Sequence, residues 1–304
     1  NHFIDKIGLT NIKESYPFLI MSILMLMVLG YTIIKRMSRK LTLRSFAFFL
    51  NHLGLFLVIS AGSLGTGDMI RLSMPIEEGE ITDMAFTRNN KAVRLPFSIG
   101  LNEFTIEEYP PELIIYNRKS GEAMIPSGSK MPFAKEGKKG RLYELDFEVL
   151  EYIQYAAPSE DGFVDSDRFG TVHAVLLKLD DGKNDTIGWV STDNFMHNAE
   201  FILYDDDFVI GIQNPKVFKY QSNVRIFEEG TIAVENHMIE VNKPLRFSNW
   251  KIYQNSYDAR FGRWSQVSIF ELIRDPWLPV VYVGIYMLLF GSLYLIYAGR
   301  KTLV

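Results

Sequence analysis

Three long apolar runs stand out in the pattern of hydrophobic and polar positions. Residues 17–34, 45–67 and 277–299 contain no charged side chain. A helix that crosses a hydrocarbon core of about 30 Å needs roughly 20 residues, and each run satisfies that length. The first run follows mixed charge rather than a basic start, which disfavours a cleaved signal peptide. The sequence therefore predicts three transmembrane helices.

Between the second and third runs the pattern changes to an alternation with a period of two. Residues 143–149 alternate strictly between apolar and acidic side chains, as in a strand with one wet face. Turn-forming residues separate 173–179 from 186–191, and a second predicted hairpin joins 223–227 to 231–235. We therefore predict an α+β membrane protein whose large outer domain is all-β, as a sandwich or a partly open barrel.

Charge predicts how the chain crosses the bilayer. The loop 35–44 carries five basic residues and no acid, and two more basic residues follow the third run. Basic ends favour the cytoplasmic side, so residues 64–276 form one outer domain between the segments 1–63 and 277–304. The seven cytoplasmic cations account for +7 of a formal net charge of −4, so the remainder carries −11. This acidity argues against nucleic acid as a partner, and the basic loop favours contact with the lipid bilayer.

The sequence contains no cysteine. Disulfides are therefore absent, and the outer domain must be stable through its own core. The chain also lacks a Cys-x-x-Cys redox pair and a Cys-x-x-Cys-His haem attachment site. We exclude both disulfide reduction and a c-type cytochrome.

Candidate chemistry is concentrated at one histidine. His52 lies in the middle of the second apolar run, and an ionisable group held in hydrocarbon predicts a functional site with a partner. The outer domain shows no nucleophile elbow, zinc-binding His pair or phosphate-cradling glycine loop. We interpret His173 as a packed core residue and expect His197 and His237 to be solvated, with ligand binding as the alternative.

Several motifs in one order resemble the ResB/CcsB family over nearly the whole chain. They are Asn51 to Gly54 in the second apolar run, Tyr220 to Arg225, Val241 to Arg246, Trp250 to Asp258, and Asp275-Pro276 before the last run. Members form the smaller half of the System II cytochrome c synthase, which moves haem across the inner membrane and attaches it to apocytochrome c. The larger half, CcsA, carries the tryptophan-rich haem-handling loop. We expect Asn242, Tyr253, Gln254 and Tyr257 to be structural, with an apocytochrome surface as the alternative.

The resemblance implies that His52 is an axial ligand to the iron of haem b, with the opposite ligand on a CcsA histidine. Neutral imidazole is a good ligand for haem iron. Four apolar residues on the same side of a helix would form a haem-facing wall: Phe48, Phe49, Leu55 and Phe56. Ordinary helix packing is the alternative interpretation of these four.

The expected function is a subunit of a haem-export and attachment complex in the bacterial inner membrane, with its large domain in the periplasm. The four tryptophans are dispersed, so the attachment chemistry is expected in a CcsA-like partner or fused half, and this chain is expected to be non-catalytic alone. The alternative is a membrane-anchored module that binds or chaperones a protein partner without a cofactor. In that case His52 only forms a hydrogen bond with a neighbouring helix.

Overall fold

The computed structural model describes most of the chain, with several gaps. Its described residues are 15–37, 43–124, 131–182, 184–228 and 236–300. The predicted strand 231–235 and residues 38–42 of the predicted basic loop therefore lie outside the described residues. The chain forms two compact units, and each is described by itself. The helical unit comprises Asn1–Leu72, Arg246–Lys251 and Leu272–Val304, and the β unit comprises Ser73–Leu245 and Ile252–Glu271.

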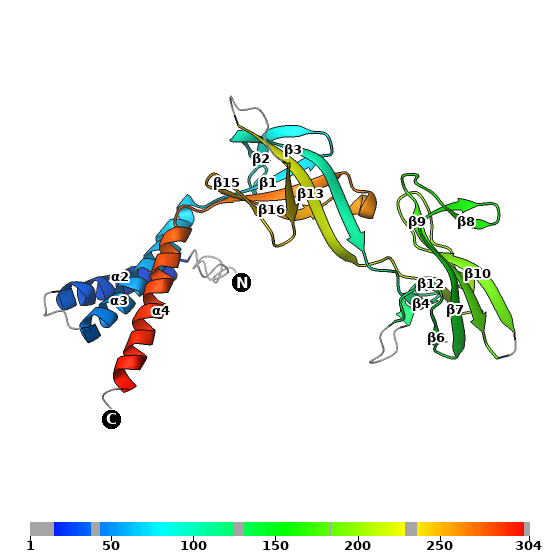
Figure 1. Ribbon diagram of the computed structural model, residues 1–304, viewed down its shortest axis with the longest axis horizontal. Helices are drawn as coiled ribbons and strands as arrows, with labels where there is room; N and C mark the ends of the chain where they lie inside the picture. Colours follow the sequence, from blue (N-terminus) through cyan, green and yellow to red (C-terminus); the bar gives the residue numbers. More distant parts are fainter. Residues whose placement is uncertain (1–14, 38–42, 125–130, 183, 229–235, 301–304) are drawn as a thin grey trace. The chain divides into compact units, whose positions relative to one another are not determined.

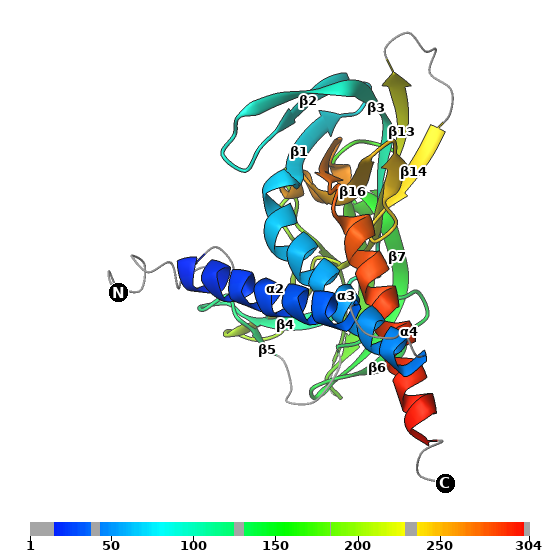
Figure 2. The same cartoon turned by 90° about the vertical axis from the view of Figure 1, so that its left-hand side faces the viewer.

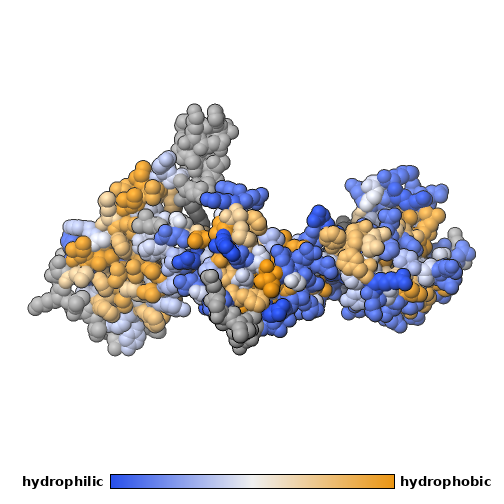
Figure 3. Space-filling model, turned by 90° about the horizontal axis from the view of Figure 1, so that it is seen from above, coloured by the Kyte–Doolittle hydropathy of each residue, from blue (hydrophilic) through white to orange (hydrophobic). Residues whose placement is uncertain are grey.

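Three long helices make up most of the helical unit. They are α2 (Tyr16–Met37), α3 (Leu43–Leu64) and α4 (Leu278–Arg300), and a short 3-10 helix, η2 (Gly65–Asp68), follows α3. Each of the three is long and apolar enough to cross a membrane. Figure 2 shows α3 running beside α4, and Figure 3 shows hydrophobic side chains gathered over the helices. The predicted membrane helices are confirmed.

Within the described residues, seventeen strands form three sheets, and Figure 1 shows their arrangement within each sheet. The first sheet has eight strands in the order β14-β13-β3-β2-β1-β17-β16-β15. Their bounds are β1 (Ile70–Glu77), β2 (Ile81–Phe86), β3 (Ala92–Glu108), β13 (Val217–Glu228), β14 (Asn236–Glu240), β15 (Leu245–Phe247), β16 (Trp250–Tyr257) and β17 (Val267–Arg274). Burial alternates along β1 and β17, as expected of strands with one face on a core. A 3-10 segment, η3 (Ala259–Trp264), connects β16 to β17.

The other two sheets share one core. The five-stranded sheet has the order β10-β9-β7-β6, with β8 paired to β7, and the four-stranded sheet has the order β11-β12-β4-β5. Their bounds are β4 (Leu113–Asn117), β5 (Ala123–Met124), β6 (Lys139–Leu142), β7 (Leu145–Ser159), β8 (Gly162–Asp165), β9 (Val172–Asp180), β10 (Asp185–Ser191), β11 (Ile202–Leu203) and β12 (Phe208–Ile212). Buried side chains from both sheets, such as Ile115, Ile210, Phe147 and Leu177, form one cluster. Two sheets packed over a common core are the arrangement of a β-sandwich. The predicted α+β membrane fold is confirmed.

One predicted hairpin is confirmed, and the start of one predicted strand is corrected. Strands β9 and β10 pair as predicted, with Thr186 opposite Leu179. The strand predicted from residue 143 begins only at Leu145, because Tyr143 has a φ of 59° and lies in the turn that leads from β6 into β7. The described hairpin partner of β13 is β14, in which Met238 lies opposite Asn223.

Gln254, which was predicted to be structural, belongs to a buried polar cluster in the first sheet. The Ser222 hydroxyl donates to Gln254 Oε1 at 2.6 Å, and Gln254 Nε2 donates to Ser268 Oγ at 2.8 Å. The three side chains come from β13, β16 and β17, and all are buried. Because these polar groups satisfy one another, they hold the strands in register without the cost of an unpaired buried group.

Candidate functional site

His52 lies in the middle of α3, and its ring is fixed by its own helix. Its Nδ1 lies 2.8 Å from the carbonyl oxygen of Phe48, one turn earlier. A carbonyl only accepts, so this hydrogen bond requires the proton on Nδ1 and leaves the lone pair on Nε2. The Phe48 ring stacks on the imidazole with centroids 3.8 Å apart. No described residue forms a hydrogen bond with Nε2, so this nitrogen presents a ligand's lone pair.

The residues on the face of His52 approach α2. The Arg36 guanidinium lies over the Phe48 ring at 5.1 Å, and a Cβ at Gly30 would lie 3.7 Å from the Phe56 ring. Phe49 and Leu55 lie about 60° to either side of His52 on the helix. All four residues of the predicted wall are half-buried, and so is His52. The structure thus places Phe48 in direct contact with the imidazole and the other three around it.

The opposite face of α3 is a seam of small residues that packs against α4. Ala47, Gly54 and Ala61 recur every seven residues and are buried, as are Gly284 and Gly291 of α4. A Cβ at Gly54 would lie 2.6 Å from the carbonyl oxygen of Gly284, so the two backbones are nearly in contact. Small residues allow this close approach of membrane helices. Since α4 occupies this seam, His52 faces away from α4.

The β unit contains a buried polar network around His173. Nε2 of His173 lies 3.1 Å from Glu108 Oε2 and 2.9 Å from Arg263 Nη1, and Nδ1 lies 2.9 Å from the Tyr152 hydroxyl. The side chains of His173, Glu108 and Arg263 are only 4%, 10% and 8% exposed. His173 is therefore buried as predicted, but among charged partners rather than in an apolar core.

Burial and charge set the protonation of this network. Burial, with the positive charge of Arg263, lowers the pKa of His173 despite the opposing effect of Glu108, and burial also lowers the pKa of Arg263. Burial raises the pKa of Tyr152 to about 12. A neutral His173 either donates from Nε2 to Glu108 or accepts there from Arg263, but not both at once. The Glu108–Arg263 pair, at 3.7 Å, is then the permanent charge pair of the network.

A cleft of about 340 Å³ opens beside this network. Its wall includes Thr171 and Asn194 and the η3 residues Phe261 and Trp264. Trp264 belongs to an aromatic row that consists of Tyr155, Trp264, Phe169, Phe195 and Phe261. Tyr155 and Phe169 of this row lie outside the cleft lining. Glu108, Arg263 and this row were not predicted from the sequence, because the residues are far apart along the chain. Only the aromatic and basic composition of Ala259–Trp264 indicates them.

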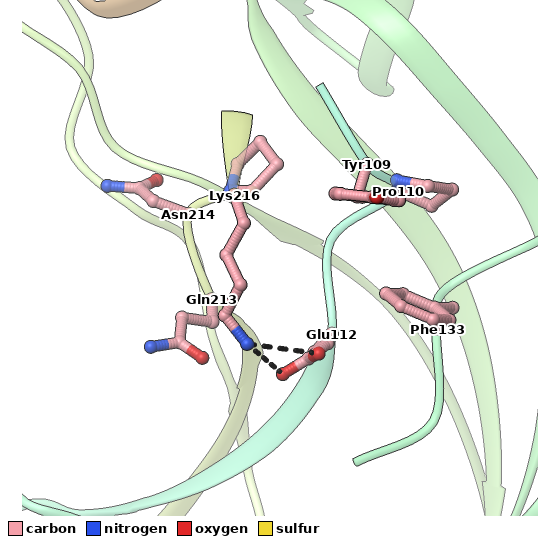
Figure 4. Close-up of a pocket in the computed structure, with 8 residues that line it drawn as sticks. Tyr109, Pro110, Glu112, Phe133, Gln213, Asn214 and Lys216 are labelled. Carbon is pink, nitrogen blue, oxygen red and sulfur yellow. Dashed lines mark hydrogen bonds and ion pairs between the residues drawn. The ribbon is translucent and has the colours of Figure 1, made fainter. Parts of the chain in front are cut away.

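Figure 4 shows a smaller cleft of the β unit, of about 190 Å³, which shares the lining residues Asn214 and Pro215 with the larger one. Lys216 and Glu112 form an ion pair at 3.3 Å on one side, and Tyr109 and Phe133 lie on the other. Because the two charged groups neutralise each other, this cleft offers mainly its aromatic side chains to a ligand.

Neither of the remaining predicted histidines lines these two clefts. His197 is half-buried in a loop, where its backbone N–H donates to Asn194 Oδ1 at 2.9 Å. His237 lies in β14 opposite Val224. Within the described residues, no group of three or more His, Cys, Asp or Glu side chains is arranged to hold a metal ion.

Comparison with known protein families gives a match that lies mostly in the β unit. No curated protein matches the chain. Residues 167–265 match the model of the ResB-like family. This segment contains His173, Arg263 and most of the aromatic row. The match supports a role related to cytochrome c biogenesis. The ResB/CcsB resemblance predicted from the sequence motifs is confirmed over this segment, because residues 167–265 are similar to the ResB-like family.

Proposed function

We propose that this protein is a ResB/CcsB-like subunit of a cytochrome c synthase. It receives haem b within the membrane through His52 and passes it outward for attachment to apocytochrome c. The observation that supports this most directly is the hydrogen bond from His52 Nδ1 to the Phe48 carbonyl at 2.8 Å. Such a bond on the far nitrogen of a ligating histidine fixes the tautomer and the orientation of the ring.

The environment of His52 suits a flat apolar ligand. The flanking Phe48 and Phe56 rings provide an aromatic surface, and the half-buried position of the imidazole leaves room for a partner on the other side of the haem. A CcsA-like membrane protein, separate or fused, would supply the second histidine and the attachment chemistry. We propose that this chain alone binds and transfers haem rather than catalysing thioether formation.

The same proposal includes the orientation in a bacterial inner membrane. The basic residues at the ends of α2 and α4, Lys35, Arg36 and Arg300, favour a cytoplasmic location for those ends. The β unit is then periplasmic, on the side where apocytochrome c would be met. His52 lies nine residues, roughly 14 Å, after the first residue of α3, in the cytoplasmic half of that helix. It would therefore receive haem from the cytoplasmic side of the membrane.

Replacing His52 by alanine tests this function. We expect the wild-type protein, co-expressed with its CcsA-like partner, to be purified with a Soret band. His52→Ala should lose about tenfold or more of the bound haem, because an iron ligand is removed. Imidazole in the buffer should restore part of the band, since it replaces the missing ring. Absorption spectroscopy on purified protein measures both effects.

The matched control is His237→Ala, which removes a histidine from β14 and should leave haem content unchanged. Assembly with the partner should be checked for each variant by size-exclusion chromatography. Full haem with an unchanged spectrum in His52→Ala would exclude His52 as the ligand.

The exposed aromatic row favours a second candidate function, in which the protein is a membrane-anchored module that binds a protein partner without a cofactor. Aromatic side chains are enriched at the centres of protein interfaces. The His52 experiment separates the two candidates, because this second function predicts no haem-dependent colour in either variant.

A further inference from the structure

Five aromatic side chains form a continuous row on the β unit, which we call the aromatic surface. It consists of Tyr155, Trp264, Phe169, Phe195 and Phe261. The centroids of neighbouring rings in this order are 6.1, 5.4, 5.4 and 5.1 Å apart. Trp264 is half-buried, and the other four residues are between 38% and 48% exposed. Contiguous exposed rings of this kind mark an interaction site more often than isolated ones do.

The buried network beneath holds this surface in place. Arg263 Nη2 donates to the carbonyl of Gln154 at 2.6 Å, next to Tyr155. Trp264 Nε1 donates to the Thr171 carbonyl at 2.9 Å, and Asn194 Nδ2 donates to the Gly170 carbonyl at 2.6 Å. These bonds tie together the segments that carry the rings. Rigid aromatic anchors lose little entropy on binding, so the surface is prepared for a partner.

One polar group in the adjoining cleft lacks a partner. The hydroxyl of Thr171 is buried, with 3% of the residue exposed, and forms no hydrogen bond with any described residue. Thr171 lines the 340 Å³ cleft beside Phe195 and Phe261. A buried hydroxyl without a partner is costly, and a ligand with polar groups would satisfy it. The backbone amides of a peptide are such groups.

The charges around the rings are predominantly acidic. Asp165, Asp167 and Asp193 are exposed and lie within a few residues of Phe169 or Phe195, against two exposed cations, Arg168 and Arg260. Arg260 and Arg263 already have acidic partners. Arg260 Nη2 lies 2.5 Å from Asp258 Oδ2, and Arg263 is paired with Glu108. Guanidinium groups of the chain already lie over three of the rings, Arg263 over Tyr155 and Trp264 at 4.7 and 5.6 Å and Arg260 over Phe261 at 5.8 Å, whereas no described cation lies over Phe169 or Phe195. The surface therefore combines rings that accept cations with a negative rim.

We propose that the aromatic surface binds an extended, basic segment of a partner polypeptide. Lysine and arginine side chains stack their stems on aromatic rings and place their charges against the ring faces, and the aspartates attract the same charges over a longer range. The peptide backbone reaches the cleft and the Thr171 hydroxyl. Binding at this surface requires no haem, so the proposal stands independently of His52.

The test measures peptide binding to the full chain in nanodiscs of phosphatidylcholine. The probe is a fluorescein-labelled peptide of lysine, leucine and glycine without regular structure, and its counterpart has glutamate in place of lysine. Fluorescence anisotropy should show binding of the basic peptide alone, weakening as salt is added. Empty nanodiscs give the background from lipid.

Paired variants locate the binding site. The double variant Phe195→Ala/Phe261→Ala should weaken binding about tenfold or more, because it removes two anchors of the interface. Asp167→Asn/Asp193→Asn should weaken binding less and reduce its salt dependence. The control is Phe133→Ala in the smaller cleft, since Phe133 and Phe195 are each 40% exposed. It should bind as the wild type does.

Three results would overturn the proposal. One is equal affinity for the acidic peptide, another is no binding above empty nanodiscs, and the third is the same loss for Phe133→Ala as for the double variant. Near-ultraviolet circular dichroism of each variant establishes that the β unit keeps its tertiary packing, so that a loss of binding reports the surface rather than unfolding.

Discussion

Two histidines in this chain are held by different kinds of hydrogen bonds. His52 donates from Nδ1 to a carbonyl of its own helix, and its Nε2 remains open. His173 is enclosed by Tyr152, Glu108 and Arg263, so both of its nitrogens are engaged. An open nitrogen suits an iron ligand, whereas an engaged ring suits the anchoring of strands and loops. The same residue type therefore points to function in one place and to architecture in the other.

The stability of the protein should depend on pH through His173. Its pKa in the folded state is below the ordinary value, chiefly because of burial, so below about pH 6.5 the unfolded chain binds a proton that the folded chain does not. The free energy of unfolding should therefore fall as pH decreases from 7 through 6.5 toward the folded pKa. Urea unfolding in detergent, followed by tryptophan fluorescence, measures this slope.

His173→Gln should flatten this part of the pH profile, because glutamine keeps polar contacts but does not titrate. The comparison with wild type at each pH removes the contribution of the carboxylates, which is common to both. A slope that is unchanged in His173→Gln would show that His173 does not cause it.

At the scale of elements, local patterns predicted more than long-range pairing. The period of two and the turn residues located β9 and β10 correctly, because hairpin register depends on a short loop. The start of β7 was wrong by two residues, since Tyr143 adopts a left-handed conformation that alternation alone does not reveal. The seam on α3 was also not predicted, although Ala47, Gly54 and Ala61 recur every seven residues, because the pattern does not say which helix fills it.

The seam predicts opposite effects for two glycines of α3. A Cβ at Gly54 would lie 2.6 Å from a backbone oxygen, whereas a Cβ at Gly62 would meet nothing within 4 Å. Gly54→Ala should destabilise the protein by about 1–3 kcal/mol, because α4 must move away. Gly62→Ala should be neutral or slightly stabilising, because alanine favours the helix. Thermal unfolding in detergent compares the two, and equal midpoints would contradict the packing described for α3 and α4.

At the scale of the whole molecule, hydrophobic periodicity was sufficient for the fold class. Apolar runs predict membrane helices and alternation predicts strands wherever a single face is buried. The order of strands in the sheets depends on contacts between residues far apart in the sequence. So does the network of Glu108, His173 and Arg263, in which Glu108 and Arg263 are 155 positions apart. One sequence contains no local signal for such contacts. His52 could be proposed as a site from the sequence because its signal, an ionisable ring in an apolar run, is local.

Under the proposed function, in which the protein meets the thiols of apocytochrome c, its lack of cysteine has a practical consequence. The attachment motif of a c-type cytochrome presents two cysteines, which must stay reduced before they react with haem. Since the chain contains no sulfhydryl or disulfide of its own, dithiothreitol should leave its melting temperature unchanged, and mixed disulfides with such a client are chemically impossible. Reductant can therefore be supplied freely to the client while this protein remains as it is.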